Sequence, residues 1–194
     1  MKIYLDTADA SEVAKHWATG MIDGVTTNPT LISKSGRKPQ DIYRELKLIG
    51  VPDVSMEIVG DAPFIVAEAH NLVQEFGDIC TIKVPCTPHG LHACKELSKE
   101  GIRTNVTLIF SAAQAILAAK SGATYVSPFV GRLDDQSVAG LEVVRSIVDL
   151  YRVHGVRTRV LAASIRSIQR VVRSFYNGAE IVTMPVGIFE QMYN

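Results

Sequence analysis

Eight short runs rich in β-branched residues alternate with longer helical patterns along the whole chain, and this alternation constrains the fold most. The predicted strands cover residues 2–5, 24–27, 54–58, 80–84, 104–108, 124–127, 159–162 and 181–183. The predicted helices cover residues 11–18, 39–49, 62–76, 88–99, 111–120, 136–154 and 168–176, with a short last helix after Pro185. The helices are followed by glycines suited to a left-handed helix end, namely Gly20, Gly50, Gly77, Gly101, Gly122, Gly155 and Gly178. The repeat of roughly 24 residues matches a compact βα unit.

Eight βα units predict a closed (β/α)8 (TIM) barrel formed by one domain, residues 1–194. The length of 194 residues is just below the usual lower limit of about 200 for this fold. An open doubly wound sheet is the alternative, but the GxGxxG turn of a dinucleotide-type sheet and a phosphate-binding GxxxxGK[ST] loop are both absent.

Charge and cysteine content limit the class of function. Lys plus Arg equals Asp plus Glu, 20 against 20, so no global field attracts nucleic acid or an anionic membrane. The first residues lack the apolar core of a secretory signal, and the longest apolar stretch, 108–119, is too short to span a bilayer. Three cysteines without CxxC spacing argue against a disulfide framework or zinc site, so we expect a cytoplasmic protein. The five histidines show no metal-ligand spacing, and we assign them no role.

Polar residues gather where the predicted strands end. In a barrel, the C-terminal strand ends and the loops after them form the active face. The candidates there are Asp6, Thr27, Asn28, Glu57, Lys83, Asn105, Thr107, Ser127, Phe129, Arg132, Ser164 and Arg166. They give one rim two carboxylates, one lysine, two arginines and several amide or hydroxyl groups.

Lys83 is the candidate nucleophile on this rim. Ile82 and Val84 flank it and should point outward to the helices, so the alternation of a strand sends Lys83 into the barrel. Burial disfavours a charged ammonium, and a neutral amine can attack a carbonyl to form an iminium that accepts electrons as a carbon–carbon bond breaks. A lysine that only extends its ammonium to water is the alternative.

The other rim residues fit proton transfer and sugar-phosphate binding. Asp6 and Glu57 suit proton shuttling beside an iminium, or else serve as ion-pair partners of Lys83. Asn28, Asn105 and Ser127 suit a polyol, or else bond to loop backbone. Arg132, Ser164 and Arg166, with the amides of a helix N-terminus, suit a phosphate. A surface pair of Arg132 with Asp134 or Asp135 is the alternative for that arginine.

These residues lie in motifs that resemble the short, microbial-type transaldolase and fructose-6-phosphate aldolase group, over nearly the whole chain. The motifs are Gly24-Val25-Thr26-Thr27-Asn28-Pro29, Ile82-Lys83-Val84-Pro85, Asn105-Val106-Thr107-Leu108-Ile109-Phe110-Ser111, Ser127-Pro128-Phe129-Val130-Gly131-Arg132 and Ala163-Ser164-Ile165-Arg166. The resemblance implies a Schiff base on Lys83, acid/base catalysis by Glu57 through a water held with Thr107, and proton transfer by Asp6. It further implies that Asn28, Asn105 and Ser127 hold a dihydroxyacetone unit, and that Arg132, Ser164 and Arg166 bind phosphate. No cofactor or metal is implied.

The resemblance favours the transaldolase branch of the group. That branch moves a dihydroxyacetone unit from sedoheptulose 7-phosphate to glyceraldehyde 3-phosphate, a step of the pentose phosphate pathway. The aldolase branch resembles a version with Gln in place of Glu57 and Tyr in place of Phe129. A fructose-6-phosphate aldolase is therefore the second hypothesis, and a non-catalytic phosphosugar-binding barrel is the third.

The resemblance also implies a homo-oligomer, commonly a pentamer or decamer. Members of the group usually continue past the position of Asn194 into a further helix that packs on a neighbouring subunit. We therefore expect that this barrel lacks that helix or assembles differently.

Overall fold

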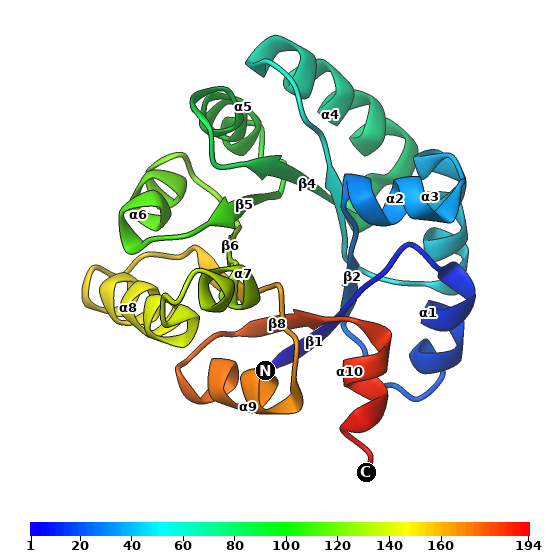
Figure 1. Cartoon of the computed structure of the whole chain (residues 1–194). Coiled ribbons are helices and arrows are strands. Elements are labelled where there is room, and N and C mark those ends of the chain that lie inside the picture. Colours follow the sequence, from blue (N-terminus) through cyan, green and yellow to red (C-terminus); the bar gives the residue numbers. More distant parts are fainter.

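A closed barrel of eight parallel strands forms the centre of the protein (Figure 1). The structure is a computed structural model that describes all residues from Met1 to Asn194. The strands are β1 (Lys2–Asp6), β2 (Gly24–Thr26), β3 (Val54–Glu57), β4 (Cys80–Pro85), β5 (Thr104–Ile109), β6 (Tyr125–Pro128), β7 (Arg159–Ala162) and β8 (Ile181–Met184). Each strand pairs with the next, and β8 pairs with β1 to close the barrel. The predicted (β/α)8 fold is confirmed.

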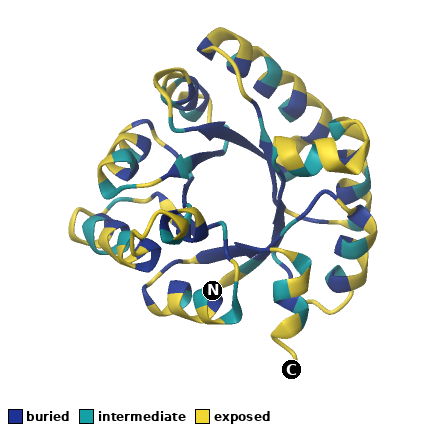
Figure 2. Cartoon of the chain, viewed as in Figure 1, coloured by how far each residue is buried: buried dark blue, intermediate teal, exposed yellow.

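Helices surround the barrel, with their buried faces toward the strands and their exposed faces outward (Figure 2). They are α1 (Ala10–Trp17), α2 (Pro29–Ser35), α3 (Pro39–Ile49), α4 (Ala62–Phe76), α5 (Pro88–Lys99), α6 (Ala112–Lys120), α7 (Val130–Asp135), α8 (Gly140–Val153), α9 (Ile168–Tyr176) and α10 (Val186–Gln191), with a 3₁₀ turn, η1, at Gly77–Ile79. None of them combines the length and the apolar character needed to cross a membrane. Several begin where a side chain accepts from a backbone amide of the first turn, as Asp9 does for α1 and Ser167 for α9.

The helix boundaries differ from the sequence prediction at three places. The short helices α2 and α7, which lie in the loops after β2 and β6, were not predicted. The helix predicted over residues 136–154 begins only at Gly140. Ser137 adopts a left-handed conformation with φ 58°, and Val138 is 44% exposed. The side chain of Asp134 accepts from the Gly140 amide across this turn, so the chain reverses direction there.

Apolar residues pack in two places. The larger cluster lies between the strands and the helices and includes Ile82 and Val84, both fully buried. A smaller cluster lies within the barrel and joins Tyr4, Tyr125, Leu161, Ala163 and Ile181, with Phe129 against it. The alternation of side chains therefore sends Ile82 and Val84 outward, as predicted.

The N-terminal end of the barrel is closed by one buried carboxylate, Asp53. Its oxygens accept hydrogen bonds from Tyr4 (2.8 Å), Tyr125 (2.7 Å) and Thr81 (2.7 Å). Arg103 lies 3.4 Å from the same carboxylate. These partners come from four different positions around the barrel, so their contacts with Asp53 link separate strands across its interior.

Gly24 is required beside this network. A Cβ atom there would lie 2.6 Å from the Tyr4 ring and 2.8 Å from the Asp53 carbonyl oxygen. Any larger residue would displace Tyr4 from the closed end of the barrel.

Candidate active site

The C-terminal ends of the strands open into a cavity of about 400 Å³. Of the twelve rim residues that the sequence singled out, all but Thr27 and Arg166 line it. The lining candidates are Asp6, Asn28, Glu57, Lys83, Asn105, Thr107, Ser127, Phe129, Arg132 and Ser164. Parallel strands bring residues that are distant in sequence to one mouth, because each strand ends on the same side.

Lys83 lies inside the cavity and is only 5% exposed. Its Nζ atom is 2.9 Å from Glu57 Oε2 and donates a hydrogen bond to the Thr27 carbonyl oxygen at 2.9 Å. The paired register of β3 and β4 sets Glu57 directly beside Lys83. Amine and carboxylate are thus in contact, and a proton can pass between them without movement of the backbone.

Thr27 contributes to the site only through its backbone. Its hydroxyl donates to the Ser55 carbonyl oxygen at 2.9 Å and lies 3.2 Å from the Tyr43 hydroxyl. The side chain is fully buried outside the cavity. The carbonyl oxygen, in contrast, holds the Lys83 amine, so Thr27 positions the lysine.

Asp6 is the second carboxylate of the cavity. Thr26 donates a hydrogen bond to Asp6 Oδ1 at 2.8 Å, and the Thr183 hydroxyl lies 2.7 Å from that of Thr26. Burial raises the pKa of Asp6 above its usual range, although the Lys83 charge and hydrogen bonds from Thr26 and Asn28 partly oppose that rise. Its carboxyl group therefore takes up a proton at higher pH than an exposed aspartate does.

Amide and hydroxyl groups form a connected row on the neighbouring strands. Ser127 donates to Asn105 Oδ1 at 2.7 Å, and Asn105 Nδ2 donates to Ser55 Oγ at 3.2 Å. Asn28 lies at the mouth, where its Oδ1 accepts from the Leu31 amide and begins α2. These contacts fix the orientation of each group before any ligand arrives.

Strand β5 is irregular where it meets the cavity. Leu108 has a left-handed conformation with φ 59°, and the register with β6 shifts between Val106 and Ile109. This bulge lets Thr107 and Leu108 both line the cavity, whereas a regular strand would turn one of them away. The Thr107 hydroxyl is buried and has no hydrogen-bond partner in the protein.

The two arginines have different surroundings. Arg132 pairs with no carboxylate, and its guanidinium lies over the Phe129 ring, 5.2 Å from the centroid. Arg166 is 54% exposed and makes a two-pronged ion pair with Asp135, with Nη2 2.6 Å from Oδ2. The surface pairing considered for Arg132 is therefore found at Arg166, which does not line the cavity but borders a neighbouring hollow together with Arg132.

The first two amides of α7 are already used within the protein. Its Val130 and Gly131 amides donate to the carbonyl oxygens of Ala163 and Ser164, at 3.0 and 2.9 Å. A Cβ atom at Gly131 would lie 2.3 Å from that Ser164 oxygen, so glycine is required there. Ser164 itself has φ 58° and lines the cavity.

Eight lining residues were not among these candidates: Thr26, Pro29, Thr30, Leu31, Leu108, Leu161, Ala163 and Thr183. Thr26 and Thr183 could have been found by counting two residues at a time along their strands, because both share the inward face. Leu108 could not, since its inward position depends on the bulge. No group of three metal-ligating side chains converges within the cavity.

Comparison with known proteins extends over the whole barrel. Residues 3–194 match the family model described as transaldolase/fructose-6-phosphate aldolase. A probable transaldolase of Anaeromyxobacter sp. (strain Fw109-5) is 45% identical over 99% of this chain and 89% of its own length. A probable transaldolase of Nitrosopumilus maritimus is 46% identical over 99% of this chain and 87% of its own length, and one of Geobacillus thermodenitrificans is 45% identical over 100% and 91%. The matches cover a barrel whose mouth holds a buried lysine paired with a glutamate, and they show that this chain belongs to the transaldolase/fructose-6-phosphate aldolase family and is an enzyme of the transaldolase type.

Proposed function

We propose that the enzyme transfers a dihydroxyacetone unit from sedoheptulose 7-phosphate to glyceraldehyde 3-phosphate through a Schiff base on Lys83. The observation that carries the proposal is the Lys83 amine, buried in a cavity of about 400 Å³ and 2.9 Å from Glu57. A protein that only bound a sugar phosphate would have no use for a buried amine aimed at the bound carbonyl.

In the first half-reaction, Nζ attacks the keto carbon of the donor and forms a carbinolamine. Glu57 returns a proton to the departing hydroxyl, which leaves as water, and an iminium remains. The unpartnered Thr107 hydroxyl provides a hydrogen-bonding group to hold the water that links Glu57 to this step.

Asp6 then takes the proton of the hydroxyl on the carbon that becomes the aldehyde. The carbon–carbon bond breaks, and its electron pair moves into the iminium to give an enamine. Erythrose 4-phosphate leaves, while the dihydroxyacetone unit stays on Lys83. Because burial raises the pKa of Asp6, its carboxylate is a stronger base than an exposed aspartate and binds this proton more firmly.

The second half-reaction reverses these steps on a new aldehyde. The enamine carbon attacks glyceraldehyde 3-phosphate, and Asp6 returns the proton to the new alkoxide. Hydrolysis of the iminium, assisted by Glu57, frees Lys83 and releases fructose 6-phosphate. Asn28, Asn105 and Ser127 orient the dihydroxyacetone hydroxyls throughout.

Arg132 and Ser164 are the proposed phosphate ligands, joined by Arg166 once it leaves Asp135. The unpaired guanidinium of Arg132 supports this role, because a two-pronged donor over an aromatic ring suits a phosphate dianion. Arg166 must exchange one anionic partner for another, so its contribution depends on the strength of its pair with Asp135.

Transfer is favoured over simple aldol cleavage by the side chains at positions 57 and 129. Glu57 can both donate and accept protons next to Lys83, and Phe129 brings no hydroxyl to the cavity. A tyrosine there would help to deliver water or a proton to the enamine and release dihydroxyacetone. With phenylalanine, we expect the enamine to persist until an acceptor aldehyde binds.

The cytosol is the compartment that we propose, because all three cysteines are free and two of them are buried. The substrates are sugar phosphates of the pentose phosphate pathway. Assembly into pentamers or decamers stays a prediction from the resemblance.

Borohydride trapping tests the proposal. Incubation with fructose 6-phosphate and borohydride should leave one three-carbon adduct on Lys83, found by mass spectrometry of the digested protein and absent from Lys83→Met. A coupled assay should then show donor consumption that requires an acceptor aldehyde. Release of dihydroxyacetone without acceptor at the rate of transfer would favour the aldolase, and failure to trap any adduct would favour a binding protein.

A further inference from the structure

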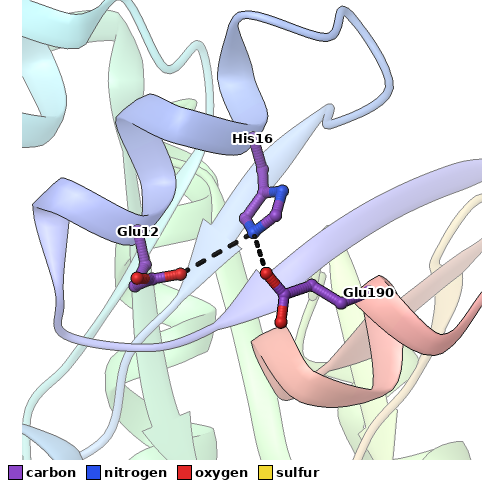
Figure 3. Close-up of side chains that lie close together, drawn as sticks. All are labelled: Glu12, His16 and Glu190. Carbon is purple, nitrogen blue, oxygen red and sulfur yellow. Dashed lines mark ion pairs between the residues drawn. The ribbon is translucent and has the colours of Figure 1, made fainter.

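The seam between the first and last helices gathers three side chains that have metal-ligating groups, outside the cavity (Figure 3). Glu12 and His16 lie four residues apart on α1 and therefore share one face of that helix. Glu190 comes from α10. One ligand atom from each residue lies within 4.8 Å of the other two. The spacing of histidines in the sequence gave no sign of this cluster, because its third member comes from the opposite end of the chain.

His16 provides an independent sign of a ligand. Its side chain is only 6% exposed, and its buried Nε2 atom makes no hydrogen bond, although it lies within ion-pair distance of both carboxylates. Buried polar atoms in folded proteins almost always have a partner. The imidazole packs edge-on against Phe189, with ring centroids 5.1 Å apart, and Nε2 is directed toward both carboxylates (Figure 3).

The spacing of the ligand atoms suits a small divalent ion. Nε2 lies 3.3 Å from Glu190 Oε1 and 3.7 Å from Glu12 Oε2. Two ligands bound tetrahedrally to Zn²⁺ at about 2.0–2.1 Å lie about 3.3–3.4 Å from each other. The pair with Glu190 already has this separation, and Glu12, whose side chain is partly exposed, needs only a small adjustment.

We propose that Glu12, His16 and Glu190 bind one divalent transition-metal ion of the Zn²⁺ type, with water completing its coordination. The imidazole favours such an ion over Mg²⁺ or Ca²⁺, which prefer oxygen ligands. The bound ion joins α10 to α1 and so holds the last helix against the first. It has no part in the Schiff-base chemistry, and the proposal does not depend on that chemistry.

Lys15 competes with the metal for the same carboxylates. Its Nζ atom lies 2.7 Å from Glu190 Oε1 and 3.9 Å from Glu12 Oε2. The lysine side chain is 59% exposed, so it can move into water when a doubly charged ion arrives. Removal of this ammonium should therefore strengthen metal binding.

Calorimetric titration of the full chain with zinc sulfate, after dialysis against a chelator, tests the site. The Cys86→Ser background removes the one thiol that is partly exposed. We expect one Zn²⁺ per chain and a higher melting temperature with zinc than with chelator, because the ion binds only the folded protein. Co²⁺ should replace Zn²⁺ and show the visible absorption of a tetrahedral or five-coordinate site.

Variants that keep the shape of each side chain make the test specific. Glu12→Gln and Glu190→Gln should each weaken zinc binding at least tenfold, and Lys15→Met should strengthen it. His70→Gln is the matched control, since His70 also pairs with a glutamate, Glu100 at 2.7 Å, but belongs to no cluster of three ligands. It should leave the affinity unchanged.

Melting temperatures in chelator establish first that each variant is folded. The proposal is overturned if the unaltered chain binds no stoichiometric zinc, or if Glu190→Gln binds zinc as tightly as the parent. An affinity that Lys15→Met leaves unchanged would likewise overturn it.

Discussion

The two ends of the barrel each hold a buried carboxylate near a cation, but they differ in how fully those groups are partnered. At the N-terminal end, Asp53 accepts three hydrogen bonds and also lies close to Arg103. At the C-terminal end, Lys83 and Glu57 face a cavity, and the Thr107 hydroxyl beside them has no partner. The groups around Asp53 already have partners within the protein, so none is left to bind a substrate. The cavity at the C-terminal end keeps hydrogen-bonding groups that a substrate can use.

This difference separates stability from reactivity. Burial raises the pKa of Tyr4 and of Tyr125, so both hydroxyls stay protonated and continue to donate to Asp53 over the physiological range. Burial also raises the pKa of Asp6, but there the result is a carboxyl group that takes up a proton at higher pH than an exposed aspartate does. Burial thus keeps the tyrosines protonated at one end of the barrel, and at the other end it makes a carboxylate more basic.

The largest effect is expected at Lys83. Lys83→Met should lower transfer activity by about 10⁴-fold or more, because no other group in the cavity could form the proposed iminium. Glu57 is left without its partner but still faces the cavity, where water can solvate it. We therefore expect the melting temperature to fall less than in Asp53→Asn. If the melting temperature of Lys83→Met fell as far as that of Asp53→Asn, the two ends of the barrel would not differ in their contribution to stability. Lys99→Met, on the exposed face of α5, is the control.

Asp53→Asn should have the opposite profile. Loss of the buried charge leaves Arg103 and two tyrosine hydroxyls without an anionic acceptor, which costs about 3 kcal/mol in the free energy of unfolding. For a chain of this size, that corresponds to a fall of roughly 6–12 °C in melting temperature. Asp149→Asn, at an exposed pair on α8, should shift it far less. Equal shifts in denaturant unfolding would show that the network does not close the barrel.

Asp6→Asn should weaken catalysis and strengthen the fold. If Asp6 is the proton acceptor as proposed, its loss should lower transfer activity about 10²–10⁴-fold. In the unaltered protein the folded state holds the Asp6 proton above the pH at which the unfolded chain loses it. That stabilisation is complete at low pH and is lost as pH rises through the folded-state pKa. The variant should therefore be the more stable protein at neutral pH, with the difference disappearing in acid.

Chemical unfolding of both proteins as a function of pH measures this difference. The acid limb of kcat/KM for the unaltered enzyme should also lie at higher pH than an ordinary aspartate would give. If Asp6→Asn were less stable than the unaltered protein at every pH, Asp6 would stabilise the fold as Asp53 does. The two ends of the barrel would then not differ in this respect.

The smallest effect is expected at Arg132. Arg132→Met should raise KM for phosphorylated donors, with a loss of about 10–100-fold in kcat/KM, because one charge-assisted contact is removed. Unphosphorylated dihydroxyacetone should react almost as before. Arg145→Met, on the exposed face of α8, is the matched control. An equal loss with both kinds of donor would remove Arg132 from the phosphate site.

The fold was largely predictable because its signals are local and repeated. Helix-ending glycines separate the eight units, and Gly20, Gly50 and Gly178 all adopt the expected left-handed conformation. The two missed helices differ in this respect. Helix α2 carries a recognisable start, since Asn28 caps it and Pro29 opens it, whereas α7 has no capping side chain to reveal it.

The site was less predictable wherever it depends on contacts between distant segments. Strand ends alone located Lys83, Glu57 and Asp6 at one rim. The pairing of Arg166 with Asp135 could not be foreseen, because it joins the loops after β6 and β7. The Asp53 network was missed for a similar reason, since Asp53 precedes its strand and its partners lie on strands far apart in the sequence.

The bulge at Leu108 bears on how long the proposed enamine on Lys83 would last. By turning an isobutyl group inward next to Thr107, it adds an apolar side chain to the cavity wall formed by β5. If an enamine forms on Lys83 as proposed, this apolar side chain helps to shield it from protonation, so the left-handed conformation of one residue favours transfer of the three-carbon unit over its loss.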